Sequence, residues 1–167
     1  MVLRKFVLFG LSALLCACGG GEPVVEQALA LPEREESAFI TDQVYVAGNS
    51  LSLWNKDGGC QLQFSKDGQK NAKTNTTWVK PMAPCYFINS PGSDKAQVFQ
   101  QDKATRIVGI LGTAIQQKSA KRCGREVQGL MINGHGNVRL SDRILSGSVY
   151  CAESGLDNFQ YSLFHGS

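Results

Sequence analysis

Histidine is the residue type suited to moving protons near neutral pH, and this sequence has two, His135 and His165. His135 lies in Asn133-Gly134-His135-Gly136, a pattern typical of an exposed turn, and His165 stands near the end of the sequence, where chains often fray. The sequence contains no nucleophile-elbow, phosphate-loop or zinc-protease motif. We therefore predict no catalytic residue, no metal, no cofactor and no enzymatic activity. The alternative is an enzyme whose acids, or His135 and an acid, meet only in the fold.

Basic side chains are the next candidates, as contacts for a partner. They fall in two loop-like segments, with Lys66, Lys70 and Lys73 in one and Lys118, Lys121, Arg122 and Arg125 in the other. Such residues often only keep a surface solvated. They could also form a positive face for an acidic protein or an anionic envelope polymer. The candidate partner-binding residues are His135, Lys70, Lys73, Lys121 and Arg122.

The first 18 residues predict export. A short basic start and an apolar run from Phe6 to Ala17 are typical of a secretory signal peptide, and the run is shorter than the roughly 20 residues that a membrane span needs. Leu15-Cys16-Ala17-Cys18 closes the run and resembles the lipobox of bacterial lipoproteins. The resemblance implies cleavage before Cys18, which would then carry diacylglycerol and an N-acyl chain. The alternative is an ordinary signal peptide with a coincidental cysteine.

The lipobox also implies a location and a division of the chain. Gly19, rather than Asp, follows the acylated cysteine, which in this family implies the outer membrane, facing the periplasm. We predict a signal peptide at 1–17, a lipid-anchored flexible linker at 18–37 and a periplasmic β domain at 38–167. A flexible linker of this length has a reach of about 25 Å. The net charge is +3 for the whole chain. It falls to about +1 without the signal peptide, so nucleic acid is not a predicted partner.

Four cysteines remain after the lipobox, namely Cys60, Cys85, Cys123 and Cys151. An even number of cysteines in an exported protein predicts two disulfides. Three pairings are possible, and we favour Cys60–Cys85 with Cys123–Cys151 because each pair encloses one hairpin-like region. A four-cysteine zinc site is the alternative, but no Cys-x-x-Cys spacing supports it.

The segments between these cysteines alternate in polarity with a period of two, as in Cys60, Leu62 and Phe64 against their polar neighbours. Asn55–Gly59 and Asn133–Gly136 are turn signals. About seven to nine short strands predict an all-β fold, a small antiparallel sandwich or barrel, with a possible short C-terminal helix after Ser154. The predicted core includes Trp54, Phe64, Trp78, Phe87, Ile107 and Met131.

The predicted periplasmic location and the lack of a catalytic motif together favour a binding protein. The first hypothesis is an inhibitor or immunity protein that blocks an envelope-acting toxin or a cell-wall hydrolase, with a loop such as Asn133–Gly136 entering the cleft of its target. The second is an accessory lipoprotein of the cell envelope that binds a membrane complex or peptidoglycan.

Overall fold

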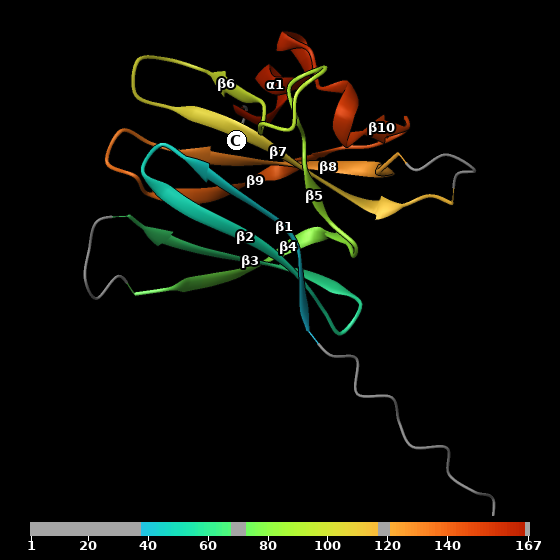
Figure 1. Cartoon of the computed structure of the whole chain (residues 1–167). Helices are drawn as coiled ribbons and strands as arrows, with labels where there is room; N and C mark the ends of the chain where they lie inside the picture. Colours follow the sequence, from blue (N-terminus) through green and yellow to red (C-terminus); the bar gives the residue numbers. More distant parts are fainter. Residues whose placement is uncertain (1–37, 68–72, 117–120, 166–167) are drawn as a thin grey trace, which may run out of the picture. The chain divides into compact units, whose positions relative to one another are not determined.

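The computed structural model describes residues 38–67, 73–116 and 121–165, which belong to one compact unit. The predicted fold class is confirmed. Two antiparallel sheets pack face to face, two disulfides brace them, and a short helical segment follows the last strand (Figure 1). The predicted signal peptide at 1–17, the linker at 18–37 and the acylated Cys18 lie outside the described residues. No helix of the described part has both the length and the apolar character needed to cross a membrane.

Sheet A is a meander of four neighbouring strands. They are β1 (Phe39–Val46), β2 (Asn49–Lys56), β3 (Gly59–Lys66) and β4 (Asn75–Met82). Two-residue turns join the first three strands, and both residues of each turn, Ala47-Gly48 and Asp57-Gly58, have positive φ. Paired positive φ values match the right-handed twist of the flanking strands, and Asp-Gly is a favoured sequence for such turns. The predicted turn within Asn55–Gly59 is therefore confirmed.

Sheet B is built around two long strands, β7 (Arg106–Ala114) and β8 (Cys123–Ile132). Two short strands, β5 (Tyr86–Phe87) and β6 (Val98–Gln100), pair with the outer side of β7. The outer side of β8 pairs with β9 (Val138–Leu145) and β10 (Tyr150–Cys151). Most residues of β7 and β8 are buried, because layers cover both faces of this sheet.

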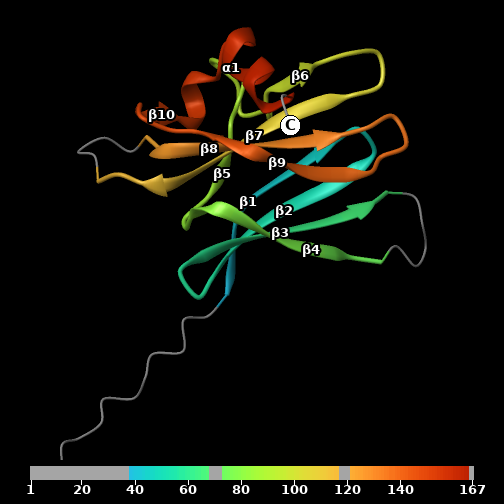
Figure 2. The same ribbon diagram turned by 180° about the vertical axis from the view of Figure 1, so that it is seen from behind.

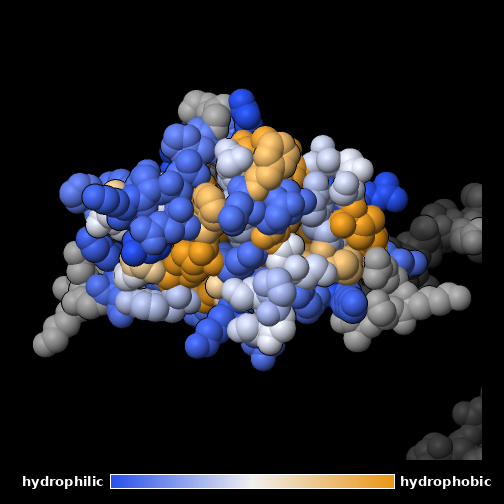
Figure 3. Space-filling view, turned by 90° about the horizontal axis from the view of Figure 1, so that it is seen from above, coloured by the Kyte–Doolittle hydropathy of each residue, from blue (hydrophilic) through white to orange (hydrophobic). Residues whose placement is uncertain are grey.

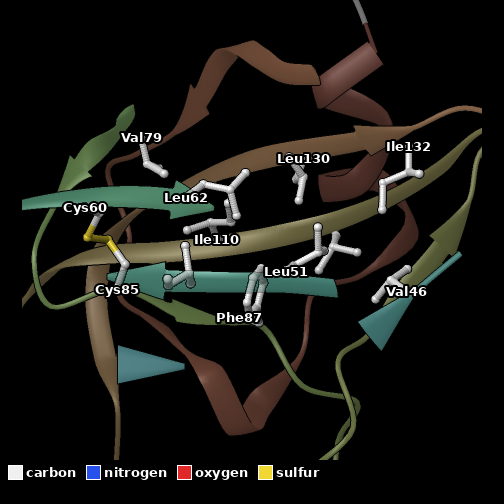
Figure 4. Close-up of a cluster of buried hydrophobic side chains, with 12 residues drawn as sticks. Val46, Leu51, Cys60, Leu62, Val79, Cys85, Phe87, Ile110, Leu130 and Ile132 are labelled. Atoms are coloured by element: carbon white, nitrogen blue, oxygen red, sulfur yellow. A yellow bond between two sulfur atoms is a disulfide. The ribbon is translucent and has the colours of Figure 1, made fainter. Parts of the chain in front are cut away.

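The main core lies between the two sheets (Figure 4). Its fully buried strand residues point inward at every second position of their strands. They are Leu51, Leu53, Cys60, Leu62, Phe87, Val108, Ile110, Leu130 and Ile132. The Cys60–Cys85 disulfide crosses this core from β3 to the residue before β5.

A second core covers the other face of sheet B. The chain after β10 forms η1 (Ala152–Ser154), α1 (Asn158–Ser162) and η2 (Leu163–His165), which lie over β7 and β8 in both views of the ribbon (Figure 2). Asp157 begins α1 with a capping box, because its carboxylate accepts the main-chain N–H of Gln160 and the Gln160 side chain accepts that of Asp157. Seen from the side of this C-terminal layer, hydrophobic residues appear as separate patches among hydrophilic ones (Figure 3).

Side chains close the open sides of the sandwich. On the β1 side, Thr41 Oγ1 donates to the carbonyl of Cys85 at 2.7 Å and the Asp42 carboxylate accepts the N–H of Phe87 at 2.9 Å. On the β4 side, Gln128 Oε1 accepts the N–H of Lys80 at 2.8 Å. Each bond joins sheet A to sheet B, and each satisfies a polar group at a strand edge.

Both predicted disulfides are confirmed. Cys60–Cys85 joins the two sheets, whereas Cys123 and Cys151 are direct cross-strand partners in β8 and β10, with 4.0 Å between their Cα atoms. The four sulfurs are consumed by these bonds, which leaves no thiolate among them for zinc.

Part of the predicted core was wrong. Phe87, Ile107 and Met131 are buried, but Trp78 is 51% exposed and Trp54 is only half-buried. Both tryptophans belong to the outward-facing positions of sheet A, which no other layer of the described chain covers. The strand alternation outweighed the general preference of aromatic side chains for the interior.

Candidate functional site

The turn between β8 and β9 is held by one asparagine. Asn133 Oδ1 accepts the main-chain N–H groups of His135 at 3.0 Å and Asn137 at 2.9 Å. The main chain adds a bond from Gly136 N to the carbonyl of Asn133, also at 2.9 Å. Gly136 has φ near +77°, which favours glycine. The predicted Asn133–Gly136 turn is thus confirmed, and it presents the exposed side chain of His135.

Sheet A braces this turn from the opposite layer. Lys66 Nζ, at the end of β3, donates to the carbonyl of His135 at 3.0 Å. Asn49, which is buried at the start of β2, lies next to Gly136, since a Cβ there would stand 3.5 Å from Asn49 Nδ2. A cleft of about 390 Å³ opens between the two sheets at this point. Its lining is Asn49, Phe64, Lys66, Lys73, Asn75, Gly136, Asn137 and Val138.

The loop between β6 and β7 supports the turn on its other side. Ala104 packs near Gly134, with 3.4 Å from the Ala104 Cβ to a Cβ placed on that glycine. Asp102 organises this loop, because its carboxylate accepts the N–H groups of Ala104 and Thr105, each at 2.7 Å. These two bonds lower the pKa of Asp102 below its usual value. The end of the sandwich that carries the β8–β9 turn, here called the turn end, is therefore a set of mutually supported loops.

The candidate basic residues do not form one face. At the turn end, Lys73 lines the cleft, and the exposed His135 directly precedes Gly136, which also lines it. Lys121 is exposed just before β8, at the other end of that strand, about 30 Å away for a strand of this length. Lys70 and Lys118 lie outside the described residues. The two basic segments thus present two separate surfaces.

Arg122 is held by other parts of the fold. Its Nε donates to Glu153 Oε1 at 2.7 Å, its Nη1 lies 3.5 Å from Asp42 Oδ2, and its guanidinium stacks over the ring of Tyr86 at 5.2 Å. Burial by itself would raise the pKa of Glu153, but the hydrogen bond and charge of Arg122 outweigh it, so that this pKa is lowered. Arg122 therefore joins β1, β5 and η1, which is a structural role that its sequence position does not reveal.

A second hollow, of about 550 Å³, lies beside the end of β7. Thr113 has φ near +54° there, donates to the carboxylate of Glu126 and accepts the N–H of Met82. Among the described residues that line it, Glu126 is the only acid. Within residues 38–67, 73–116 and 121–165, no three acidic, histidine or cysteine side chains gather in a group that could hold a metal ion.

The outer face of sheet A is the surface that the sequence interpretation missed. Three rows of cross-strand neighbours cover it. They are Ile40–Trp54–Gln61–Trp78, Gln43–Ser52–Gln63–Thr76 and Tyr45–Ser50–Ser65. None of these eleven side chains is charged. The sequence did carry the signal, because Trp54 alternates with the buried Leu51 and Leu53 and thus falls in register with the serines of β2.

Comparison with protein-family models, curated proteins and solved structures finds no match to this chain.

Proposed function

We propose that this chain is a non-enzymatic, lipid-anchored binding protein of the bacterial periplasm that blocks another protein, either an envelope-acting toxin or a cell-wall hydrolase. Two observations support the periplasmic location. They are the lipobox-like Leu15-Cys16-Ala17-Cys18 and the two disulfides, which are compatible with an oxidising compartment outside the cytoplasm. On this proposal Cys18 carries the acyl chains and the segment 18–37 lets the β domain reach partners near the outer membrane.

The turn end is the surface on which the proposal depends. A loop that is already ordered loses little conformational entropy when it enters the cleft of a partner. Asn133, Lys66 and Asp102 order three neighbouring segments there, and they leave His135 and Lys73 exposed. The positive charges of Lys66 and Lys73 favour an acidic partner surface, such as the carboxylate-lined cleft of a glycan hydrolase.

Inhibition assays with the full chain test this function. The protein, exported and purified from membranes in detergent, is added to lysozymes and to other cell-wall hydrolases acting on purified sacculi. We expect a stoichiometric loss of lytic activity for at least one hydrolase. We expect inhibition to weaken about tenfold or more in a Lys73→Ala/His135→Ala double variant, because Lys73 lines the cleft and His135 is exposed on the turn beside it.

Lys121→Ala is the matched control, since it removes an exposed cation from the other end of β8. Full retention of inhibition by that variant assigns the contact to the turn end. If the Lys121 variant loses inhibition and the double variant keeps it, the assignment is wrong. If no hydrolase is inhibited and a strain lacking the protein resists envelope toxins as well as its parent does, the blocking function itself is wrong.

The anchor has its own test. A Cys18→Ser variant should lose incorporation of labelled palmitate and should leave the membrane fraction, because the acylated thiol would be gone. Labelling that persists in this variant would contradict acylation at Cys18.

A further inference from the structure

We propose that the outer face of sheet A binds a neutral glycan strand, of the kind formed by the amino-sugar backbone of the cell wall. The inference uses the proposed periplasmic address to choose among glycans, but the site itself is independent of the turn end. It concerns the three rows of outward side chains on β1 to β4 described above.

The face has the two kinds of group that sugars require. A pyranose ring offers a flat side of C–H bonds, which packs on an aromatic ring, and a rim of hydroxyls, which need uncharged donors and acceptors in the same plane. Tyr45 is 61% exposed and Trp78 is 51% exposed. Between the aromatic positions lie amides and hydroxyls only, which are Gln43, Ser50, Ser52, Gln61, Gln63, Ser65 and Thr76.

The geometry suits an extended chain rather than one small molecule. Trp54, Gln61 and Trp78 are consecutive partners across β2, β3 and β4. The two indoles therefore stand two strand spacings apart, about 9.6 Å, which is comparable to a disaccharide unit. The row of Gln43, Ser52, Gln63 and Thr76 runs beside them. A shallow hollow of about 140 Å³ lies next to this row, lined in part by Ser52 and Gln63.

Trp78 is fixed in its exposed position. A Cβ on Gly59 would come within 3.0 Å of Trp78 Cζ3, so the indole rests on the backbone of a residue that has no side chain. A ring held against the sheet loses little freedom when a sugar covers its other side. The exposed area therefore serves as a preformed platform.

Charge narrows the choice of ligand. The nearest charges lie around the face, at Lys56, Asp67 and Lys80, and none lies within the three rows. Lys80 follows Trp78 on the same side of β4, but its ammonium group donates to the carbonyl of Asp142 in sheet B at 2.9 Å. Nucleic acid would need cations along its phosphates. A stable protein interface would be expected to have an apolar centre with charged residues excluded to its rim, whereas here the centre consists of amides and hydroxyls. An uncharged, hydroxyl-rich polymer matches both the composition and the flatness of the face.

The fluorescence of the protein reports on this site alone, because its two tryptophans are Trp54 and Trp78. The full chain in detergent is titrated with N-acetylglucosamine hexamer, with a neutral glucan hexamer and with purified sacculi. We expect a blue shift and protection from a soluble quencher with the amino-sugar hexamer, and co-sedimentation with sacculi. Trp78→Ala should weaken binding about tenfold or more, and Gln61→Ala/Gln63→Ala should weaken it by a similar factor.

Phe159→Ala is the matched control, because Phe159 is an exposed aromatic residue, 71% accessible, on α1. It should bind like the parent protein. No spectral response of the unaltered protein to any glycan would overturn the proposal, as would undiminished binding in both sheet A variants. A response to the glucan alone would overturn the assignment to amino sugars. Self-association that buries the tryptophans and is lost in Trp78→Ala would show that a second copy occupies this face instead. Inhibition of hydrolases through the turn end is measured separately and does not change these outcomes.

Discussion

The side-chain amide of Gln128 donates a hydrogen bond of 2.7 Å to the main-chain carbonyl of Ser141. The pairing of β8 with β9 shifts register at this point, from Leu130 opposite Leu140 to Gln128 opposite Ile144, so the bulge of β9 frees that carbonyl from the ladder. The other end of the same amide accepts the N–H of Lys80 in β4. Gln128, at 1% exposure, therefore joins three strands of two sheets with one side chain.

Removal of this amide should destabilise the fold. Gln128→Leu keeps the side-chain volume but leaves the part-buried N–H of Lys80 and the buried carbonyl of Ser141 unpaired, which we expect to cost about 1–3 kcal/mol. Urea unfolding followed by tryptophan fluorescence measures the loss. Gln43→Leu, on the exposed side of β1, is the control and should change stability by less than about 0.5 kcal/mol. Equal losses in the two variants would show that the bridge contributes nothing particular.

Gly129, the neighbour of Gln128, sets how closely the C-terminal layer can approach sheet B. A Cβ at this position would stand 2.5 Å from Phe164 Cγ. Gly129→Ala should therefore displace η2 and lower stability by about 1–3 kcal/mol, as overpacking does in cores. Thermal unfolding and the rate of chymotrypsin cleavage near Tyr161 measure the effect. Gly134→Ala has 3.4 Å to its nearest neighbour and should be close to neutral, and a similar loss there would refute the packing argument.

The two disulfides should contribute similarly to stability although their placement differs. They span 25 and 28 residues, and loop-closure entropy gives about 3.5 kcal/mol for each. Replacing either pair by alanines should lower the free energy of unfolding by about that amount. A loss for Cys60/Cys85 at least twice that for Cys123/Cys151 would mean that contact between the sheets, not chain entropy, is what that bond mainly supports.

The ion pair of Glu153 and Arg122 should give stability that depends on pH. The pKa of Glu153 is lowered in the folded protein, so its contribution is present above the unfolded value of about 4.3 and is lost as pH falls through the folded pKa. Because the carboxylate is 41% exposed, we expect Glu153→Gln to cost less than about 1 kcal/mol at pH 7. The difference from the parent should shrink as pH falls below the unfolded value and vanish once pH lies below the lowered pKa of the folded state. A difference that stays constant down to pH 3 would contradict the sign of this shift.

Local patterns in the sequence predicted much of this fold. Alternation in Cys60, Leu62 and Phe64 was enough to predict β3, and Asn133–Gly136 was enough to predict the turn, because strand period and turn chemistry are properties of neighbouring residues. The partners of Arg122 were not predictable in the same way. Glu153 and Asp42 lie 31 and 80 positions away, and only the packing of β1 and η1 brings them together.

The tryptophans were misplaced for a different reason. Trp54 and Trp78 were predicted to lie in the core because they are large aromatic residues. The alternation along β2 and β4 assigns both to the outward face instead. A general preference for the interior is weaker than the constraint that a strand imposes on every second side chain. The candidate glycan face became visible only when these positions were read together across the sheet.

Sheet A uses residues 39–82 alone and sheet B uses residues 86–151 alone. The polypeptide therefore passes from one sheet to the other once. Every strand of sheet A pairs only with strands from the same half of the chain. A chain that emerges amino end first, from a ribosome or through a membrane, can finish its first meander by contacts between successive hairpins, with short loop closures throughout. The Cys60–Cys85 disulfide can form only after Cys85 has emerged. It then links the finished sheet A to the segment that leads into sheet B.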